Sequence, residues 1–384
     1  MARLLHQKQR DTNLLCALLL DAEADELAIA NLWDKEREYL RGLSAALVAE
    51  CEVLRPRPSA ADVRGDAPRC VDDPEAYLEA LAPGTCYSRF RFYKDEILQL
   101  YHLVVVPCLD DPSLPPDTVR DRDGSVHHAL KGLLVLLRRL KAPIDWDELQ
   151  WEFGLTSNRL GQLFARMVFL MLNNHGHLLQ GITMFRPHFQ TYANAIAARG
   201  AAMYNCVGFV DGTFWPVARP SLYEWRLYNG KYRCHGIKFQ NVVGPNGMVM
   251  DHCGPYLGSE HDSSMLGYSG FLDRFAGCVG LLGDPDHFAI FGDPAYSISN
   301  YLLRPHGGAW ITARQEEFNL GMSRVRISVE WTFGKVYQLW GFLRDSEKQK
   351  VYDAPHGAGV GDVYRCATLL TNFHTCLYGS NANT

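Results

Sequence analysis

The 384-residue sequence contains no Cys-x-x-Cys pair among its 11 cysteines, so it has neither a zinc-ribbon nor a thioredoxin-type redox signature. The cysteines are scattered from Cys16 to Cys376, which is typical of buried thiols in a reducing compartment. No apolar run approaches the length of about 20 residues that spans a bilayer. The short apolar run at residues 13–20 is followed at once by acidic residues rather than by a signal-peptide cleavage site. The sequence therefore predicts a soluble intracellular protein with no membrane part.

An excess of basic residues is also lacking, because the formal net charge is −5. This counts against a nucleic-acid partner, whose usual footprint is a basic chain. It does not exclude one, since some carboxylates can be metal ligands and a local basic stripe can bind phosphate. No Lys/Arg-rich import run is present. A nuclear location would follow only from a DNA substrate, and the location is otherwise expected to be cytoplasmic.

The chain divides into four segments by composition and periodicity. Residues 1–54 have apolar residues at helical spacing, and residues 55–84 are predicted to be a linker that begins with a stretch rich in Pro, Asp and Arg. Residues 85–203 form a second helical region. From residue 204 to residue 384 short β-rich runs alternate with helical stretches, which predicts an α/β sheet with helices packed against it.

Residues 145–173 have the outline of a helix-turn-helix. A short amphipathic helix is followed by a turn at Gly154, an N-cap at Thr156 or Ser157, and a longer helix. The same pattern also fits a plain helical hairpin in a bundle core. In a helix-turn-helix, the residues on or beside the exposed face of the second helix would be Asn158, Arg159, Gln162 and Arg166.

The β-rich part has three strand-like runs in succession, then a helix, another strand and a closing helix. Gly-Pro-Asn-Gly at residues 244–247 predicts a turn between two of the strands. The expected strands lie in residues 206–217, 233–244, 247–258 and 287–296, and the expected helices in residues 263–275, 298–303 and 315–340. A further helix is expected at residues 126–140.

Two aspartates follow buried strand-like runs. Asp211 comes after the apolar residues 207–210, and Asp293 comes after residues 288–292. A carboxylate at such a place costs several kcal/mol unless it is paired or coordinates a cation. Each aspartate alone could instead cap the turn that follows it.

A third acid, Glu330, lies beside the apolar face of a predicted helix. Arg326 comes one turn before it and Gly334 one turn after, so Glu330 could point into a site. A surface Arg326–Glu330 pair, worth only about 0.3–0.5 kcal/mol, is the alternative. The apolar face consists of Val325, Val329, Phe333 and Val336.

Taken together, Asp211, Asp293 and Glu330 suit one site at the edge of a sheet. Hard oxygen ligands favour Mg²⁺ or Mn²⁺ over zinc. Two such ions about 3.5–4 Å apart would activate a water or a DNA 3′-hydroxyl and stabilise the leaving oxygen. That chemistry is the hydrolysis and joining of phosphodiester bonds.

At these residues the sequence resembles the PIF/Harbinger group of DDE transposases and their domesticated nuclease relatives. The similarity runs over roughly residues 87–378 and consists of several motifs in order. The motifs are GFVDGT at 208–213, GSEHD at 258–262, GDPAY at 292–296, the block from Phe318 to Val336, and LLTNFHTCL at 369–377.

The resemblance implies an RNase H-like catalytic domain with the triad Asp211, Asp293 and Glu330, whose members are 82 and 37 residues apart. It implies that the helical block before residue 204 binds DNA, which favours the helix-turn-helix. It also implies a Myb-like DNA-binding partner protein and a homo-oligomer on DNA. Two departures, Ala295 where Gly is commoner and Trp331–Thr332 after the acid, remove no ligand.

Several further residues are candidates near the triad. Asp262 and His261 are accessory candidates, although Asp262 could equally cap a loop. Lys238 is expected to meet phosphate or to lie on a solvated strand face. Arg326 and Lys335 add cations beside Glu330. A segment of basic and aromatic residues can bind backbone and stack on bases, or it can be a core with a charged rim. Its members are Arg219, Arg226, Lys231, Arg233, Trp215, Tyr223, Trp225, Tyr228 and Tyr232.

Three functions follow from these patterns. The first is a metal-dependent DNA endonuclease of the transposase type. The second is a domesticated, transposase-derived DNA-binding protein without catalytic activity, which an intact triad does not exclude. The third is a metal-dependent hydrolase of small phosphate esters, for which the large helical block would have no purpose.

Overall fold

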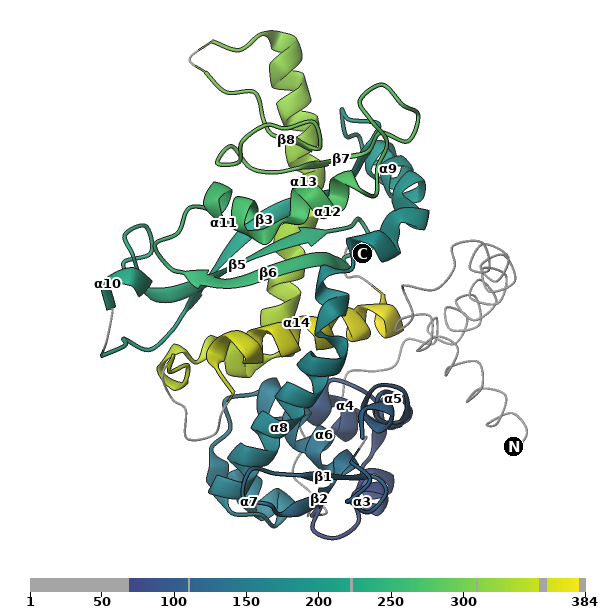
Figure 1. Cartoon of the computed structure of the whole chain (residues 1–384), viewed down its shortest axis with the longest axis vertical. Helices are drawn as coiled ribbons and strands as arrows, with labels where there is room; N and C mark the ends of the chain where they lie inside the picture. Colours follow the sequence, from purple (N-terminus) through teal and green to yellow (C-terminus); the bar gives the residue numbers. More distant parts are fainter. Residues whose placement is uncertain (1–68, 110, 222–223, 309, 352–357, 380–384) are drawn as a thin grey trace, which may run out of the picture. The chain divides into compact units, whose positions relative to one another are not determined.

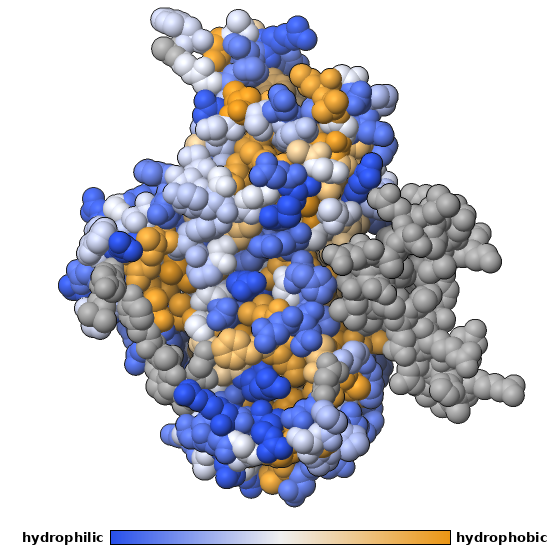
Figure 2. Space-filling view, viewed as in Figure 1, coloured by the Kyte–Doolittle hydropathy of each residue, from blue (hydrophilic) through white to orange (hydrophobic). Residues whose placement is uncertain are grey.

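The computed structural model describes residues 69–379, except residues 110, 222–223, 309 and 352–357, and the side chains of residues 327–331 are not described (Figure 1). The predicted helical segment 1–54 and residues 55–68 of the predicted linker therefore lie outside the described residues, whereas residues 69–84 of that linker include the helix at Pro74–Ala80. None of the helices in the described ranges has the length and apolar character needed to cross a membrane. On the face drawn in Figure 2, hydrophobic residues form several patches among hydrophilic ones.

The chain forms two compact units, and residues 75–107 belong to the smaller one. Its core contains Phe90, Phe92 and Ile97, which are fully buried. Tyr93 begins one helix with a capping box, in which its backbone N–H donates to Glu96. The predicted second helical region is thus helical here. The elements are α3 (Pro74–Ala80), α4 (Pro83–Phe90), α5 (Lys94–Leu100), the π-helix η2 (Tyr101–Val105) and η3 (Val106–Cys108).

The larger unit comprises residues 69–74 and 108–384, so the boundary expected after residue 203 falls inside it. Whether that boundary separates independently folding parts stays a prediction. The unit begins with an antiparallel pair of strands, β1 (Thr118–Arg120) and β2 (Val126–His128). The helix expected from residue 126 starts three residues later, because residues 126–128 pair with β1 instead.

Three helices follow, and the first packs against both members of the predicted helix-turn-helix. Gly154 ends the second helix with φ +66°, a left-handed value that glycine adopts at little cost. Thr156 occupies the N-cap position of the third. The two helices and their turn are confirmed, whereas their role on DNA stays a prediction. The helices are α6 (Ala129–Lys141), α7 (Trp146–Phe153) and α8 (Ser157–His175).

A mixed sheet forms the centre of the larger unit. β5 pairs antiparallel with β3 and with β6, and β7 and β8 continue the sheet beyond β3 as parallel strands. The four predicted strands are confirmed, although the last is short. The helix expected at residues 298–303 is wrong, because its end is β8. The strands are β3 (Cys206–Pro216), β4 (Tyr228–Asn229), β5 (Cys234–Val243), β6 (Val249–Leu257), β7 (Ala289–Phe291) and β8 (Leu302–Leu303).

Alternating residues of the strands build a core on each face of the sheet. Val210 and Ile290 pack with α9, α11 and α12 on one face, whereas Phe209 and Phe291 pack with Met322 and Phe333 of α13 on the other. Helices therefore cover both faces, and α13 extends beyond the sheet (Figure 1). The remaining helices are η4 (Gly176–Gln180), η5 (Ile182–His188), α9 (Phe189–Ala198), α10 (Glu224–Leu227), α11 (Asp262–Ser269), α12 (Phe271–Ala276), α13 (Ala313–Leu339), η6 (Gly341–Arg344), η7 (Ser346–Lys348) and α14 (Val360–Tyr378).

Candidate active site

The two predicted aspartates come together where β7 ends, although Asp211 lies in the middle of β3 rather than at the strand end that the sequence predicted. Phe209 of β3 and Phe291 of β7 are partners in parallel register, and both pack under α13. Asp211 and Asp293 each follow two residues later. Because neighbouring strands are about 4.8 Å apart, this register brings the two carboxylates to adjacent positions. Both line one pocket of about 880 Å³.

The carboxylate of Asp211 is largely buried, with a side-chain exposure of 18%. The Arg326 guanidinium donates to its Oδ2 at 3.0 Å, and the backbone N–H of Gly212 donates to its Oδ1 at 2.9 Å. The pKa of Asp211 is nevertheless raised to about 6, chiefly by burial and to a lesser extent by the nearby carboxylates of Asp293 and Asp262, against the effect of Arg326. Burial therefore outweighs the stabilising effect of Arg326 on the ionised carboxylate.

Asp293 is half-buried just beyond the end of β7. Its Oδ1 accepts a hydrogen bond from the backbone N–H of Ala295 at 2.8 Å, so it does cap the following turn. The turn-capping alternative is therefore confirmed for Asp293, and its role as a metal ligand stays a prediction. Each carboxylate oxygen has two lone pairs, which leaves capacity for a cation at both aspartates.

The accessory candidates line the same pocket. Asp262 is the first residue of α11, and its Oδ1 accepts from Lys238 Nζ at 2.9 Å. It is thus a polar member of the pocket paired with a cation. A Cβ at Gly212 would lie 2.9 Å from Asp262 Oδ1, so this close approach requires glycine. His261 is exposed at the N-cap position of α11.

Lys238 is not on a solvated strand face, because its side-chain exposure is only 13%. Its ammonium also donates to the carbonyl of Glu260 at 2.7 Å. Arg326, expected to meet DNA, is paired with Asp211 at the pocket wall. DNA contacts by these two cations stay predictions.

The third predicted acid lies on α13, but the side chain of Glu330 is outside the described residues. Its helix position comes one turn after Arg326, whose side chain reaches Asp211. Among the described side chains, no group of three or more His, Cys, Asp or Glu residues is arranged to hold a metal ion. The convergence of the full triad therefore stays a prediction.

Two predicted DNA contacts need correction, since both side chains are buried. Lys335 donates to Thr375 Oγ1 and to the carbonyl of Gly379 within the protein, and burial lowers its pKa to about 8. Gln162 donates to Asp123 at 2.6 Å and is 6% exposed. Helical spacing alone did not reveal that these positions face neighbouring elements. Asn158, Arg159 and Arg166 are exposed, as expected.

The sequence motifs did not identify a polar pair, Gln240 and Tyr296, that lies next to the acids. Gln240 of β5 donates to the buried hydroxyl of Tyr296 at 2.9 Å and to the carbonyl of Asp262. The Tyr296 ring also lies against Gly292, where a Cβ would be 2.7 Å from it. Tyr296 holds the turn after β7 in place and so positions Asp293. Tyr296 is the tyrosine of the GDPAY motif, and this motif is the sequence signal that could have identified it.

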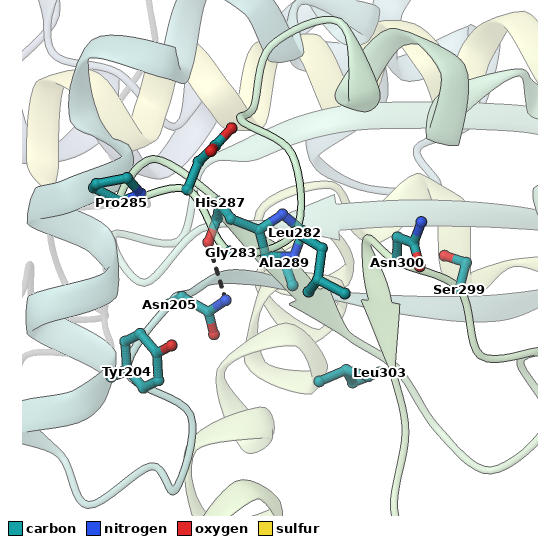
Figure 3. A pocket seen from close by; sticks show the side chains of 11 residues that line it. Tyr204, Asn205, Leu282, Gly283, Pro285, His287, Ala289, Ser299, Asn300 and Leu303 are labelled. Carbon is teal, nitrogen blue, oxygen red and sulfur yellow. Dashed lines mark hydrogen bonds between the residues drawn. The ribbon is translucent and has the colours of Figure 1, made fainter.

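A second pocket, of about 620 Å³, lies where β3 and β7 begin, whereas Asp211 lies in the middle of β3 and Asp293 beyond the end of β7. In Figure 3, Asn205 donates to the carbonyl of His287 at 3.0 Å, with Tyr204 and Leu303 nearby. This pocket contains none of the predicted site residues.

The donor set fits a hard divalent cation. Asp211 and Asp293 present carboxylate oxygens in one pocket, and burial raises the pKa of Asp211, so a bound cation would stabilise its ionised form. Both of these ligands are carboxylate oxygens, and hard oxygen ligands suit Mg²⁺ or Mn²⁺.

The raised pKa predicts a pH-dependent stability in EDTA. A pKa above the unfolded value of 3.8 gives stability that is present at low pH and lost as pH rises through about 6. Between pH ~4 and ~7 the wild type should lose up to roughly 3 kcal/mol more than Asp211→Asn. Urea unfolding of both proteins across this range tests it, and parallel pH curves would contradict it.

Comparison with known proteins bears on this same part of the chain. Residues 210–372 match the family model of the DDE superfamily endonucleases, and the match includes Asp211, Asp293 and Glu330. No curated protein and no solved structure matches the chain. The expected resemblance is confirmed at this level, and the Harbinger subgroup stays a prediction. The segment that carries the candidate active site is thus similar to DDE superfamily endonucleases.

Proposed function

We propose that the protein is a divalent-metal-dependent DNA endonuclease of the transposase type. One observation carries the proposal: Asp211 and Asp293, from neighbouring parallel strands, share a pocket within the segment that matches DDE superfamily endonucleases. The mixed sheet with helices on both faces is compatible with an RNase H-like domain of this kind. The ordered motifs support placing it in the PIF/Harbinger group.

In this proposal Asp211, Asp293 and Glu330 hold two Mg²⁺ or Mn²⁺ ions. When bound, the ions supply positive charge for the attacking and leaving oxygens of an in-line displacement at phosphorus. Arg326 orients Asp211 through its hydrogen bond, and Tyr296 positions the turn that carries Asp293. Lys238 keeps Asp262 turned toward the pocket.

The helical part is proposed to hold the DNA. Arg159 and Arg166 are exposed on α8 and would contact phosphates. A homo-oligomer on DNA, a Myb-like partner protein and a nuclear location accompany this proposal.

One observation favours the second function, a DNA-binding protein without catalysis. Asp211 and Asp262 are each ion-paired with a cation of the protein itself. Such pairs neutralise carboxylates in a site that holds no metal. The two functions differ in whether divalent ions displace these pairs.

Nicking of supercoiled plasmid separates the two functions. The wild type with Mg²⁺ or Mn²⁺ should convert plasmid to the open circle, and Asp293→Ala should not. Absence of nicking by the wild type, together with DNA binding that weakens steeply with salt, would instead favour the non-catalytic function.

A further inference from the structure

Aromatic side chains line the same pocket as the acids. We call residues 228–235 the aromatic hairpin: β4 and the start of β5 pair there, and a four-residue loop joins them. Asn229 Oδ1 accepts from the backbone N–H groups of Lys231 and Tyr232, and its Nδ2 donates to the carbonyl of Gly258. The hydrogen bonds of Asn229 thus hold the loop in one conformation and tie it to the end of β6.

Two of these aromatic rings form a stack on the sheet. The tip of the Phe214 ring of β3 lies against Gly236, where a Cβ would be only 2.3 Å from it. The Tyr232 ring lies parallel to Phe214, with centroids 4.6 Å apart and an interplanar angle of 9°. Tyr232 is 50% exposed, so the stack ends in an aromatic surface that solvent reaches.

The pocket that contains this surface also contains cations. The Lys231 ammonium lies over the Tyr232 ring, 5.4 Å from its centre, and a base that covers this ring would displace it on its long, exposed side chain. Lys238 and Arg326 belong to the same pocket. An anionic chain with flat apolar rings complements such a combination, because its phosphates meet the cations while a ring covers Tyr232.

We propose that Tyr232, supported by Phe214, is a stacking platform for an unpaired nucleobase of the DNA strand next to the cleavage position. The inference rests on the proposed function, since the platform and the acids line one pocket. Bases inside a duplex are already stacked on their neighbours and cannot cover the tyrosine. The platform therefore favours single-stranded or frayed DNA over a closed duplex.

The test measures DNA binding by the full chain in EDTA, so that no cleavage interferes. The probes are a 12-nucleotide single strand with one 2-aminopurine and a blunt duplex of the same sequence. Tyr232→Ala should weaken single-strand binding about fivefold to 150-fold and abolish the fluorescence quenching of the probe, while changing duplex binding less than about twofold. Tyr232→Trp should retain both properties, because it keeps a ring.

Tyr268→Ala is the matched control, because that ring is 70% exposed and outside the pocket. It should leave binding of both probes unchanged. Equal weakening of both probes by Tyr232→Ala, no weakening, or no single-strand binding by the wild type would overturn the platform.

Plasmid nicking is measured beside the binding so that the two proposals can fail separately. Ring-dependent quenching by a protein that does not nick would support the platform and reject the nuclease. Metal-dependent nicking, together with single-strand binding that is unchanged in Tyr232→Ala, would support the nuclease and reject the platform.

Discussion

Asparagine in place of Asp211 or Asp293 is expected to lower the rate of metal-dependent plasmid nicking by at least about a thousandfold. Each change removes one anionic metal ligand and leaves the side chain nearly the same in shape. The two residues belong to one pocket, so the double variant should be scarcely slower than either single variant. Initial rates with saturating Mg²⁺ and with saturating Mn²⁺ measure the effect.

Asp286→Asn is the control for charge alone. Asp286 is exposed in the loop before β7 and does not line the acidic pocket. Its variant should nick plasmid at the wild-type rate. Circular dichroism spectra of all variants should coincide. Nicking by Asp211→Asn and Asp293→Asn within a few-fold of the wild type would remove both aspartates from the reaction.

The second large effect concerns stability, and Glu152→Ala is expected to destabilise the protein by about 3–5 kcal/mol. Glu152 of α7 accepts from Arg138 Nε of α6 at 2.9 Å, and the two side chains are 3% and 9% exposed. Without Glu152, the buried Arg138 guanidinium loses its buried partner and keeps only the exposed carboxylate of Glu148. Urea unfolding, monitored by the helical signal, measures the change.

Glu148→Ala is a matched control on the same helix. Glu148 accepts from Nη2 of the same arginine at 3.0 Å, but its side chain is 61% exposed. Surface ion pairs contribute about 0–1 kcal/mol, so this variant should lose less than about 1 kcal/mol. Similar losses for both variants would mean that the buried pair does not hold the first helix of the helix-turn-helix against the preceding one.

The sequence located the two aspartates because strands have a short-range signature. Each aspartate ends a run of apolar residues, and a buried strand is one of few structures that such a run can form. Their adjacency followed from the motif resemblance, since no local pattern encodes that β3 and β7 are parallel neighbours. The register between Phe209 and Phe291 supplies that information.

Other features depend on partners far along the chain. Residues 298–303 have few strand-forming signals, yet Leu302–Leu303 pairs with β7 and becomes the edge of the sheet. Lys335 looks like a surface cation on its helix, but α14 covers it through Thr375. The Phe214–Tyr232 stack depends on the space above Gly236. In each case the structure depends on packing between distant segments, which local sequence propensity does not encode.

Mn²⁺ soaked into crystals of the full chain, and located by its anomalous scattering, tests the central claim most directly. The account predicts two ions in the pocket, held by carboxylate oxygens of Asp211, Asp293 and Glu330. A pocket that takes up no Mn²⁺, or a Glu330 carboxylate that ligates neither ion, would contradict it.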